Sequence, residues 1–556
     1  MKQLFPLQNL LLIIVSCLLI SCEENLIKAD LIVTNGSIWT GNEKQPMVKA
    51  MAILGDSIIA IGTNEEIQVF KGNQTEVIDV RGKFITPGFI DAHVHLLMGG
   101  NSLLNVALRD AGTPKEFTSR IAKFTEQVAP GTWIVEGNWD HTLWGGELPT
   151  KEWIDEYTVD YPVAVYRLDG HMILANSAAL KIAGIDKNTP EVPNGEIVRH
   201  PDGTPTGILK SNAMYLVLDK IPELSDTQKE NAILAAQDYL LAHGVTSIHD
   251  VDSLGTYIIA DKLLKTGKLN MRIYTADPIS HWKELNRRTD TDSKWLKSGL
   301  LKGFVDGSLG SHTAAFKDAY SDRKNDHGFF INSAKDMYKW VSEADKKNWQ
   351  ITVHAIGDSA IHSLQNTFER VIQENGVKDR RFRMEHAQHI APEDMNRFAN
   401  LGIIVSVQPY HAIDDGRWAE DLIGPKRVKT TYAFKSLMDS KTTVVFGSDW
   451  PVAPASPLYG MYAAVTRRTL DSMNPEGWVP EQKISVDRAL RAYTTNGAYA
   501  SFDEHRKGSL EAGKLADFVI LSENLTTIDP IHLKDTKVLA TYVGGKKVYA
   551  VLLSKN

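Results

Sequence analysis

A long alternation of strand-like and helix-like runs begins at Thr113 and governs which fold this chain can adopt. Short β-branched runs such as TSIHDV, QITVHAIGD and TTVVFGSDWP alternate with amphipathic stretches such as DTQKENAILAAQDYLLAHG and DSAIHSLQNTFERVIQENG. Strands that alternate with helices indicate a parallel sheet, because each helix returns the chain to the same edge of the sheet. The repeated pattern predicts an α/β fold, a (β/α)₈ TIM barrel with insertions.

Both ends of the chain have a different pattern, made of short alternating runs separated by turns. DLIVTNGSIWTG and KAMAILGDSIIAIGT, between Asp30 and Ile85, contain the turn pairs Asn-Gly and Gly-Asp and predict hairpins. GSLEAGKLADFVIL and VLATYVGGKKVYAVLL, near the other end, have the same pattern. We therefore expect a small β-sandwich built from residues 26–87 and 508–556, next to a barrel formed by residues 88–507.

Composition places the chain among ordinary globular proteins. Of its 556 residues, 43% are hydrophobic and 23% are charged, and the net charge is −7. This balance, with no long basic run, argues against a nucleic-acid partner. The two cysteines, Cys17 and Cys22, lie near the N-terminus, so we expect no disulfide and no thiolate metal site in the folded body. Any transition-metal site must use His, Asp, Glu or an unusual ligand.

The first 22 residues, MKQLFPLQNLLLIIVSCLLISC, resemble a bacterial lipoprotein signal peptide. Lys2 precedes an apolar core from Leu10 to Ile20 that is too short for a transmembrane helix. The end, LISC, resembles a lipobox and implies cleavage before Cys22 and lipidation of that residue. A plain secretory signal cleaved elsewhere is the alternative. We expect an exported protein of the bacterial cell envelope, lipid-anchored to the membrane and facing the periplasm or the cell surface.

Polar side chains gather at the C-terminal ends of the expected barrel strands. In chain order they are His93, His95, Lys302, His354, His386 and Asp449. A buried parallel strand favours Val, Ile and Leu, so polar residues there are costly unless they bind something. A barrel brings these strand ends to one face, where the active sites of this fold lie.

The residue types at these strand ends predict a metal site. His93 and His95 are two residues apart on one strand, so their side chains point the same way. Neutral imidazoles bind zinc and similar divalent ions, and Asp449 can add a carboxylate. His354 and His386 supply two more imidazoles, enough for a second ion. We expect a divalent metal cofactor, zinc by preference, with one or two ions.

Several motifs resemble those of a known family. PGFIDAHVHL, VHAIGD, EHAQ and GSDWP are similar to motifs of the amidohydrolase superfamily. KGFVDGSLGSHTA and DGHMILANSAAL resemble its amidohydrolase-3 branch of YtcJ-like proteins, which includes N-substituted formamide deformylase. The resemblance covers nearly everything from residue 30 to residue 550 and implies the barrel, the split β-sandwich and metal-dependent hydrolysis.

The resemblance also implies roles for individual residues. It makes all six strand-end residues named above metal ligands. Asp449 matches an aspartate that touches the metal and acts as general base and then as general acid. Lys302 matches a lysine that can be carboxylated, so that its carbamate bridges two ions. Because a bare lysine is a cation and cannot bind a metal, a buried lysine or an ordinary ion pair is the alternative.

Other residues near the motifs are assigned less directly. His171, in RLDGHMILANSAAL, matches a position that faces the substrate, and a loop hydrogen bond is its alternative. Asp306 is expected to bind the substrate, or else to lie behind the ligands. His362 and His389 are expected to be structural. The loops GNWDHTLWGG and QPYHAIDDGRW suggest an apolar or aromatic group on the substrate through the aromatic residues Trp139, Trp144, Tyr410 and Trp418.

Together these features predict hydrolysis of a small-molecule carbon–nitrogen bond other than a peptide bond, in an amide, an N-substituted formamide or a cyclic amide. Metal-activated water would attack the carbonyl while Asp449 moves the proton from the water to the leaving nitrogen. The alternatives are an esterase or lactonase on the same site, and a non-catalytic, surface-tethered binding lipoprotein. The sequence contains no G-x-S-x-G, H-E-x-x-H or P-loop motif.

Overall fold

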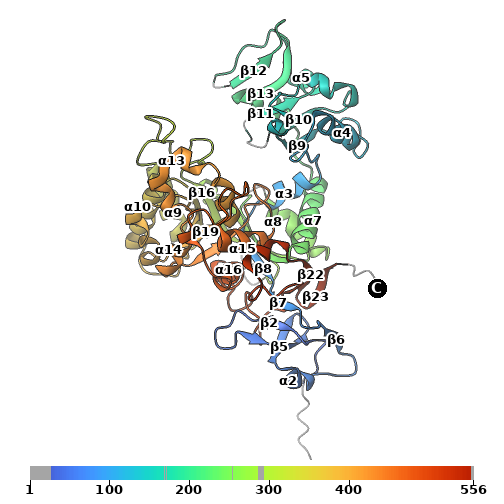
Figure 1. The fold of residues 1–556 in the computed structure, drawn as a ribbon, viewed down its shortest axis with the longest axis vertical. Helices are drawn as coiled ribbons and strands as arrows, with labels where there is room; N and C mark the ends of the chain where they lie inside the picture. Colours follow the sequence, from blue (N-terminus) through green and yellow to red (C-terminus); the bar gives the residue numbers. More distant parts are fainter. Residues whose placement is uncertain are drawn as a thin grey trace, which may run out of the picture.

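The protein forms a central barrel, with a pair of small sheets at one end and a separate lobe at the other (Figure 1). The computed structural model describes residues 27–551, except residues 168–169, 171, 194, 253–254 and 286–292. Within that part of the chain, no helix combines the length and the apolar character needed to cross a bilayer. The expected signal peptide and Cys22 lie outside the described residues.

Eight parallel strands form the barrel. They are β8 (Phe89–Val94), β14 (Val245–Asp250), β15 (Arg272–Pro278), β16 (Leu296–Phe304), β17 (Gln350–Ala355), β18 (Arg383–His386), β19 (Ile404–Val407) and β20 (Val444–Phe446). Each strand pairs with the next along the chain. The ring closes just beyond β8 and β20, where the Asp449 amide donates to the His93 carbonyl at 2.8 Å and the His95 amide donates to the Trp450 carbonyl at 2.9 Å. The predicted (β/α)₈ barrel is confirmed.

Helices cover the outside of the barrel. They are α7 (Asp226–Ala242), α8 (Thr256–Lys265), α9 (Ala334–Lys346), α10 (Asp358–Asn375), α11 (Arg397–Asn400), α14 (Phe434–Asp439), α15 (Pro457–Thr466), α16 (Val486–Ala492) and α17 (Thr495–Ala500). In α9, the buried residues Met337, Val341 and Ala344 recur at helical spacing and form one apolar face. The helices α3 (Leu96–Leu103), α12 (Pro409–Asp415) and α13 (Ala419–Arg427) follow strand ends.

Two small sheets lie together, and one of them contains strands from both ends of the chain. The first holds β1 (Leu31–Thr34), β4 (Ala50–Leu54), β5 (Ser57–Gly62) and β6 (Glu76–Asp79), with helix α2 (Asn64–Gln68) beside it. The second holds β2 (Ser37–Trp39), β3 (Met47–Val48), β7 (Phe84–Pro87), β21 (Phe518–Leu521), β22 (Val538–Val543) and β23 (Lys546–Ala550). Ile85 lies opposite Ile520, and the two sheets share a core that includes Val33 and Phe518. The β-sandwich predicted from both chain ends is therefore confirmed.

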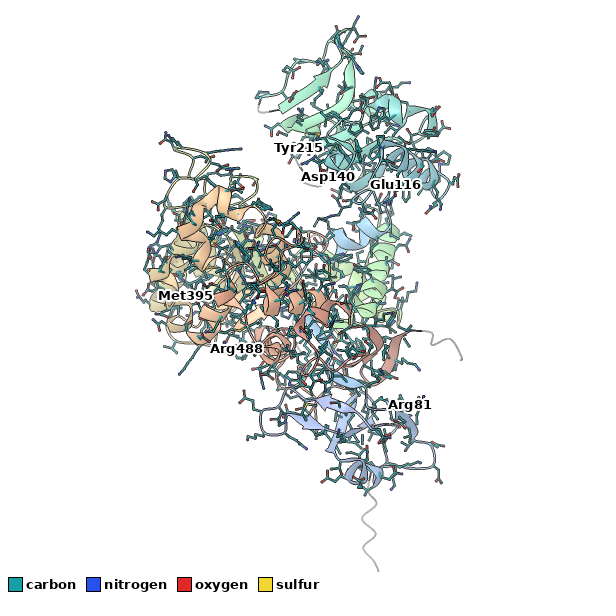
Figure 2. All side chains as sticks on the ribbon, in the orientation of Figure 1. Arg81, Glu116, Asp140, Tyr215, Met395 and Arg488 are labelled. Atoms are coloured by element: carbon teal, nitrogen blue, oxygen red, sulfur yellow. The ribbon has the colours of Figure 1, made fainter. Side chains whose placement is uncertain are left out.

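A lobe that the sequence analysis did not separate from the barrel lies between α3 and α7 (Figures 1 and 2; Glu116, Asp140 and Tyr215 are labelled). Its elements are β9 (Ile134–Trp139), β10 (Val163–Arg167), β11 (Met172–Ala175), β12 (Gly195–Arg199), β13 (Pro205–Ser211), α4 (Pro114–Thr125), α5 (Ser177–Ala183) and α6 (Tyr215–Leu218). Separate apolar cores lie on the two faces of its five-stranded sheet. The strands β9 and β10 are parallel, whereas the other three pairs of this sheet are antiparallel, unlike the pairs of the barrel.

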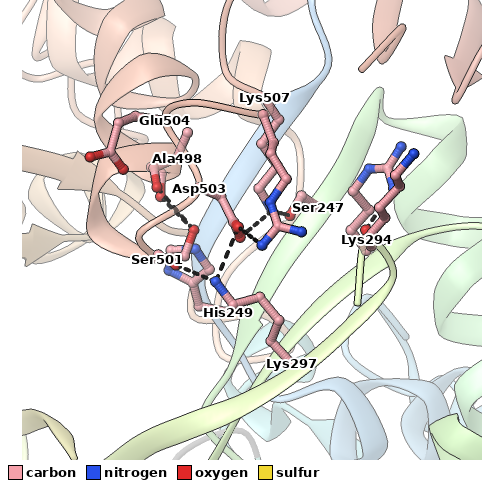
Figure 3. A network of polar contacts seen from close by, with 12 residues as sticks. Ser247, His249, Lys294, Lys297, Ala498, Ser501, Asp503, Glu504 and Lys507 are labelled. Atoms are coloured by element: carbon pink, nitrogen blue, oxygen red, sulfur yellow. Dashed lines mark hydrogen bonds and ion pairs between the residues drawn. The ribbon is translucent and has the colours of Figure 1, made fainter. Parts of the chain in front are cut away.

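Polar contacts close the N-terminal end of the barrel (Figure 3). Lys297, at the start of β16, donates from Nζ to the Ser501 carbonyl at 2.7 Å and to Oδ1 of Asp503 at 3.1 Å. Lys507 donates from Nζ to Oγ of Ser247, on β14, at 2.6 Å. These hydrogen bonds connect the segment after α17 to the barrel strands β14 and β16. The opposite end of the barrel carries the candidate site.

Candidate metal centre

A cavity of about 520 Å³ lies at the C-terminal ends of the barrel strands. Its lining includes all six strand-end residues, namely His93, His95, Lys302, His354, His386 and Asp449. They come from the first, fourth, fifth, sixth and eighth strands of the barrel, or from the residues directly after them. The structure thus brings together the side chains that the sequence analysis expected to meet.

Two of these residues have a left-handed backbone conformation. The φ angle is 70° at His386, the last residue of β18, and 61° at Asp449, which follows β20. This region costs a non-glycine residue about 1–2 kcal/mol, and such strain gathers at functional sites. At Asp449 the conformation allows the amide to bond the His93 carbonyl, which places the carboxylate beside both histidines of the first strand end.

Three of the histidines use their Nδ1 atoms for hydrogen bonds to side-chain oxygens. The pairs are His93 with Glu385 at 2.5 Å, His95 with Asp252 at 3.0 Å, and His386 with Gln408 at 2.8 Å. A carboxylate or amide oxygen only accepts, so Nδ1 carries the proton and Nε2 keeps its lone pair. Partners of this kind orient histidines that bind metals.

Glu385 and Asp252 are functional candidates that the sequence analysis missed. Glu385 is fully buried and lies 2.9 Å from Nη2 of Arg383. Burial opposes its ionisation, but the charge of Arg383 and the hydrogen bond from His93 hold the pKa of Glu385 well below its ordinary value. The available signal was a carboxylate inside a buried strand, where an acidic residue is costly without a partner.

The free nitrogens of His93 and His95 converge on one oxygen of Asp449. Oδ1 of Asp449 lies 3.4 Å from Nε2 of His93 and 3.1 Å from Nε2 of His95. Ligand atoms bound at about 2.1 Å around a tetrahedral ion lie about 3.4 Å apart. Nε2 of His93 and Oδ1 of Asp449 are buried and make no hydrogen bond within the described part of the chain. The donor set and its spacing therefore fit a divalent ion.

A second group of ligand atoms lies at the other oxygen of Asp449. Atoms of His386, His411 and Asp449 all lie within 4.8 Å of one another, and Nε2 of His411 is 3.9 Å from Oδ2 of Asp449. Burial lowers the pKa of His411, which favours the neutral imidazole. His411 was not predicted as a ligand from the sequence, although QPYH lies just after the end of β19.

Lys302 and His354 lie at the ends of neighbouring strands, β16 and β17. Nε2 of His354 donates to the Gly307 carbonyl at 2.9 Å, so Nδ1 keeps the lone pair. Burial lowers the pKa of Lys302 to about 8. Within the described residues, Nζ of Lys302 has no hydrogen bond or ion pair and lies 5.0 Å from the centroid of the Phe304 ring. The ordinary ion pair that the sequence left open is thus not seen there.

Asp306 lies behind the cavity rather than in its lining. Its side chain has no exposed surface, and its carboxylate accepts from the backbone amides of Ala315 at 2.8 Å and of Ile356 and Gly357 at 2.9 Å. A substrate contact needs an oxygen that faces the cavity, so the expected substrate-binding role of Asp306 does not fit. The carboxylate instead fixes the loop after β17. His171 lies outside the described residues, and its role stays a prediction.

The two histidines expected to be structural do not line the cavity. Nδ1 of His362 lies 2.9 Å from Oδ1 of Asp394, and Nδ1 of His389 lies 2.9 Å from Oγ1 of Thr431. Neither histidine therefore belongs to the site.

Only one of the four aromatic residues expected near the substrate, Trp418, lines the cavity. Trp139 is buried in the lobe and donates from Nε1 to the Val165 carbonyl at 2.9 Å, and Trp144 packs against the same lobe core. Tyr410 packs beside Tyr459. Aromatic residues pack in small cores as well as in binding pockets. The expectation that Trp139, Trp144 and Tyr410 lie near the substrate was therefore wrong.

Comparisons with known proteins agree with this geometry. The chain matches the Amidohydro_3 model of the amidohydrolase family over residues 76–549. Protein LONG AFTER FAR-RED 3 of Arabidopsis thaliana is 40% identical over 544 residues, which cover 94% of this chain and 92% of that protein. N-substituted formamide deformylase of Arthrobacter pascens is 29% identical over 538 residues, 93% and 97% of the two chains. The crystal structure of an uncharacterized metal-dependent hydrolase from Pyrococcus horikoshii superposes with a TM-score of 0.76 at 27% identity, covering 90% of this chain and 99% of that one.

Proposed function

The chain belongs to the amidohydrolase family, a family of metal-dependent hydrolases, and from this premise we propose that it hydrolyses a non-peptide carbon–nitrogen bond of a small molecule. The observation that carries the proposal is the convergence of Nε2 of His93 and Nε2 of His95 on Oδ1 of Asp449. Two oriented imidazoles and a carboxylate can hold a metal ion, and the same carboxylate can move a proton, which hydrolysis needs and binding alone does not.

His93, His95 and Asp449 would hold one divalent ion, zinc by preference, because two imidazoles and a carboxylate suit that metal. Lys302, His354 and His386 would contribute to a second ion at the neighbouring strand ends. A bound ion of this kind supplies Lewis acidity and makes hydroxide available near neutral pH. Glu385 and Asp252 would orient His93 and His95 toward it.

Asp449 would act as the general base and then as the general acid. Burial opposes its ionisation, but His93 and His95 beside it hold the pKa of Asp449 well below its ordinary value, so Asp449 is an ionised carboxylate at neutral pH. In our proposal it takes the proton of the attacking water and returns it to the leaving nitrogen. One water is consumed, the carbon–nitrogen bond breaks, and a carboxylic acid and an amine are released.

Lys302 would be carboxylated on Nζ. Only a neutral amine adds to carbon dioxide, and burial lowers the pKa of Lys302 to about 8, so a useful fraction is neutral near pH 7. The lysine cation first loses one proton to become a neutral amine, and the addition of carbon dioxide then releases a second proton and leaves an anionic carbamate ligand. The lack of a hydrogen-bonded partner for Nζ among the described residues supports this role.

Two observations, the cavity and the name of one relative, support a substrate class. The cavity, of about 520 Å³, suits a small molecule, and Trp418 and Leu309 give part of its wall an apolar character. The deformylase of Arthrobacter pascens points to N-substituted formamides as the first class to test. Other amides and cyclic amides follow, and an ester or lactone on the same site is the competing reaction.

The test is a matched substrate panel on the purified, metal-analysed protein: an N-benzylformamide, its formate ester, a cyclic imide and a dipeptide. We expect turnover of the formamide or another non-peptide amide, and none of the dipeptide. Turnover of the ester alone would support the esterase alternative. A protein that binds metal and ligands but turns over none of these compounds would support the non-catalytic alternative.

For location, we propose export and a lipid anchor at Cys22, on the strength of the LISC sequence that ends the apolar N-terminal segment. The partners would then be a small-molecule substrate and, through the anchor, a membrane of the bacterial cell envelope. The net charge of −7 gives a nucleic acid little to bind.

A further inference from the structure

We propose that His411 is a metal ligand, and that it holds a second divalent ion together with His386 and Asp449. The inference rests on the metal centre proposed above and adds to it a ligand from a strand end that the motifs left out. Lys302 and His354 would complete the surroundings of the same ion.

His411 reaches the cavity because of where the seventh barrel strand ends. Strand β19 ends at Val407 and α12 begins at Pro409, so the chain passes from strand to helix at the cavity wall. Gln408, between them, accepts from Nδ1 of His386 at 2.8 Å. His411 follows three residues later, a spacing that places two side chains on neighbouring parts of one helical turn. One short segment therefore both orients His386 and supplies a second imidazole beside it.

The free nitrogen of His411 lacks a partner. Nε2 is buried and makes no hydrogen bond to any described residue. It lies 3.9 Å from Oδ2 of Asp449, too far for a hydrogen bond, in a group of candidate ligand atoms that all lie within 4.8 Å of one another. A polar atom left unpaired beside a carboxylate in a buried wall indicates a partner that both atoms share.

His389 provides the contrast. Its Nε2 atom is also buried without a hydrogen bond, but its ring lies among apolar neighbours, with the ring centroids of Phe316 and Tyr432 at 5.3 and 6.3 Å. His389 does not line the cavity and belongs to no group of close ligand atoms among the described residues. Burial of an unpaired nitrogen therefore does not by itself make a histidine a candidate metal ligand.

The two oxygens of Asp449 serve different groups. Oδ1 faces His93 at 3.4 Å and His95 at 3.1 Å, while Oδ2 faces His411 at 3.9 Å. Two-metal hydrolytic centres hold their ions about 3.5–4 Å apart, a spacing that one bridging carboxylate can span. Asp449 would thus lie between the two groups of ligand atoms, with His411 beside Oδ2.

The test compares metal binding by the full-length wild-type protein and by His411→Ala, His411→Gln and the control His389→Ala. Each protein is loaded with zinc, dialysed against metal-free buffer and analysed for metal per chain. Chelator competition gives the dissociation constant of each ion, cobalt substitution gives the visible spectrum of the ligand field, and circular dichroism verifies folding. Glutamine is closer to histidine in size than alanine is. If only His411→Ala fails to fold, His411→Gln can still be compared with the wild type.

We expect two ions in the wild type and in His389→Ala, and one ion in both His411 variants. At the least, the second ion should bind more weakly by the roughly 10–100-fold that loss of an outer-shell partner costs. Two ions bound with unchanged affinity and an unchanged cobalt spectrum in the folded His411 variants would overturn the inference. So would a wild type with a single ion, because the first position is complete without His411. A wild type that binds no ion would instead contradict the proposed function.

Discussion

Nδ1 of His93 lies 2.5 Å from Oε2 of Glu385, and at most 1% of either side chain is exposed. This contact joins the first and sixth strands of the barrel across its interior, and it fixes which nitrogen of His93 faces Asp449. Arg383 pairs with the same carboxylate at 2.9 Å. The site is therefore built on a buried ionic network, and the residues that orient the expected ligands are open to test.

Glu385→Gln should weaken metal binding by about 10–100-fold, because a neutral amide orients His93 less firmly than a carboxylate. It should also lower the free energy of unfolding by about 3–5 kcal/mol, because Arg383 keeps a buried, unpaired charge. Asp252→Asn, which leaves no arginine unpaired, separates the two effects and should weaken metal binding with little loss of stability. Chelator competition and denaturant titration measure both quantities. Wild-type metal affinity in both variants would rule out the orienting role.

Lys302→Ala should lose metal and activity together if a carbamate of Lys302 is a ligand. Added bicarbonate or a short-chain carboxylic acid should restore part of both, because either supplies an anionic oxygen in the vacated space. Carbon-13 NMR of wild-type protein prepared with labelled bicarbonate should show a carbamate carbon that is missing from the variant. An unchanged metal content in the variant would remove Lys302 from the ligand set.

Asp517→Ala should destabilise the whole protein, because its carboxylate joins the sandwich to the barrel. Asp517 accepts from Nε and Nη2 of Arg272, on β15, at 2.6 and 2.7 Å, and both side chains are buried. Breaking such a pair costs about 3–5 kcal/mol. Asp439→Ala, which removes an exposed carboxylate paired with Arg488, should cost less than about 1 kcal/mol. Equal denaturation midpoints for the two variants would contradict this difference.

Cys22→Ala should abolish lipid attachment, and a chain that begins at residue 23 should be soluble and active. The reason is that the sandwich and the barrel bury their own apolar cores. Labelling with a radioactive fatty acid and membrane fractionation measure attachment. Incorporation of label by the Cys22→Ala variant, or an insoluble truncated chain beside a folded full-length one, would argue against the anchor and against an independent body.

The sequence predicted the barrel and the strand-end residues because both follow from local rules. His93, His354 and His386 are polar residues at the ends of apolar strands, and the closure of the barrel brings such ends together. The partners of these residues could not be predicted in the same way. Glu385 faces His93 only because β18 lies across the barrel interior from β8, which is a tertiary relationship.

The role of His411 and the separate lobe were not predicted, for related reasons. His411 comes from the helix after β19 rather than from the strand itself, so the period-two pattern that selected His93 and His95 does not include it. The lobe also contains both strands and helices, and the pairing of β9 to β13 with one another, which a sequence does not show, separates it from the barrel. The prediction that Trp139 lies near the substrate failed for this reason, because Trp139 ends β9 and packs in a core of the lobe.

The central claim is that Asp449 both contacts the metal and moves the proton. Asp449→Asn keeps the size of the side chain and one oxygen ligand but cannot accept a proton at neutral pH. The most direct measurement is metal per chain and kcat, side by side, for Asp449→Asn and for His93→Ala. We predict that Asp449→Asn keeps at least one ion while kcat falls by about 10² or more, and that His93→Ala loses metal and activity together. Near-normal turnover in metal-loaded Asp449→Asn would contradict the account.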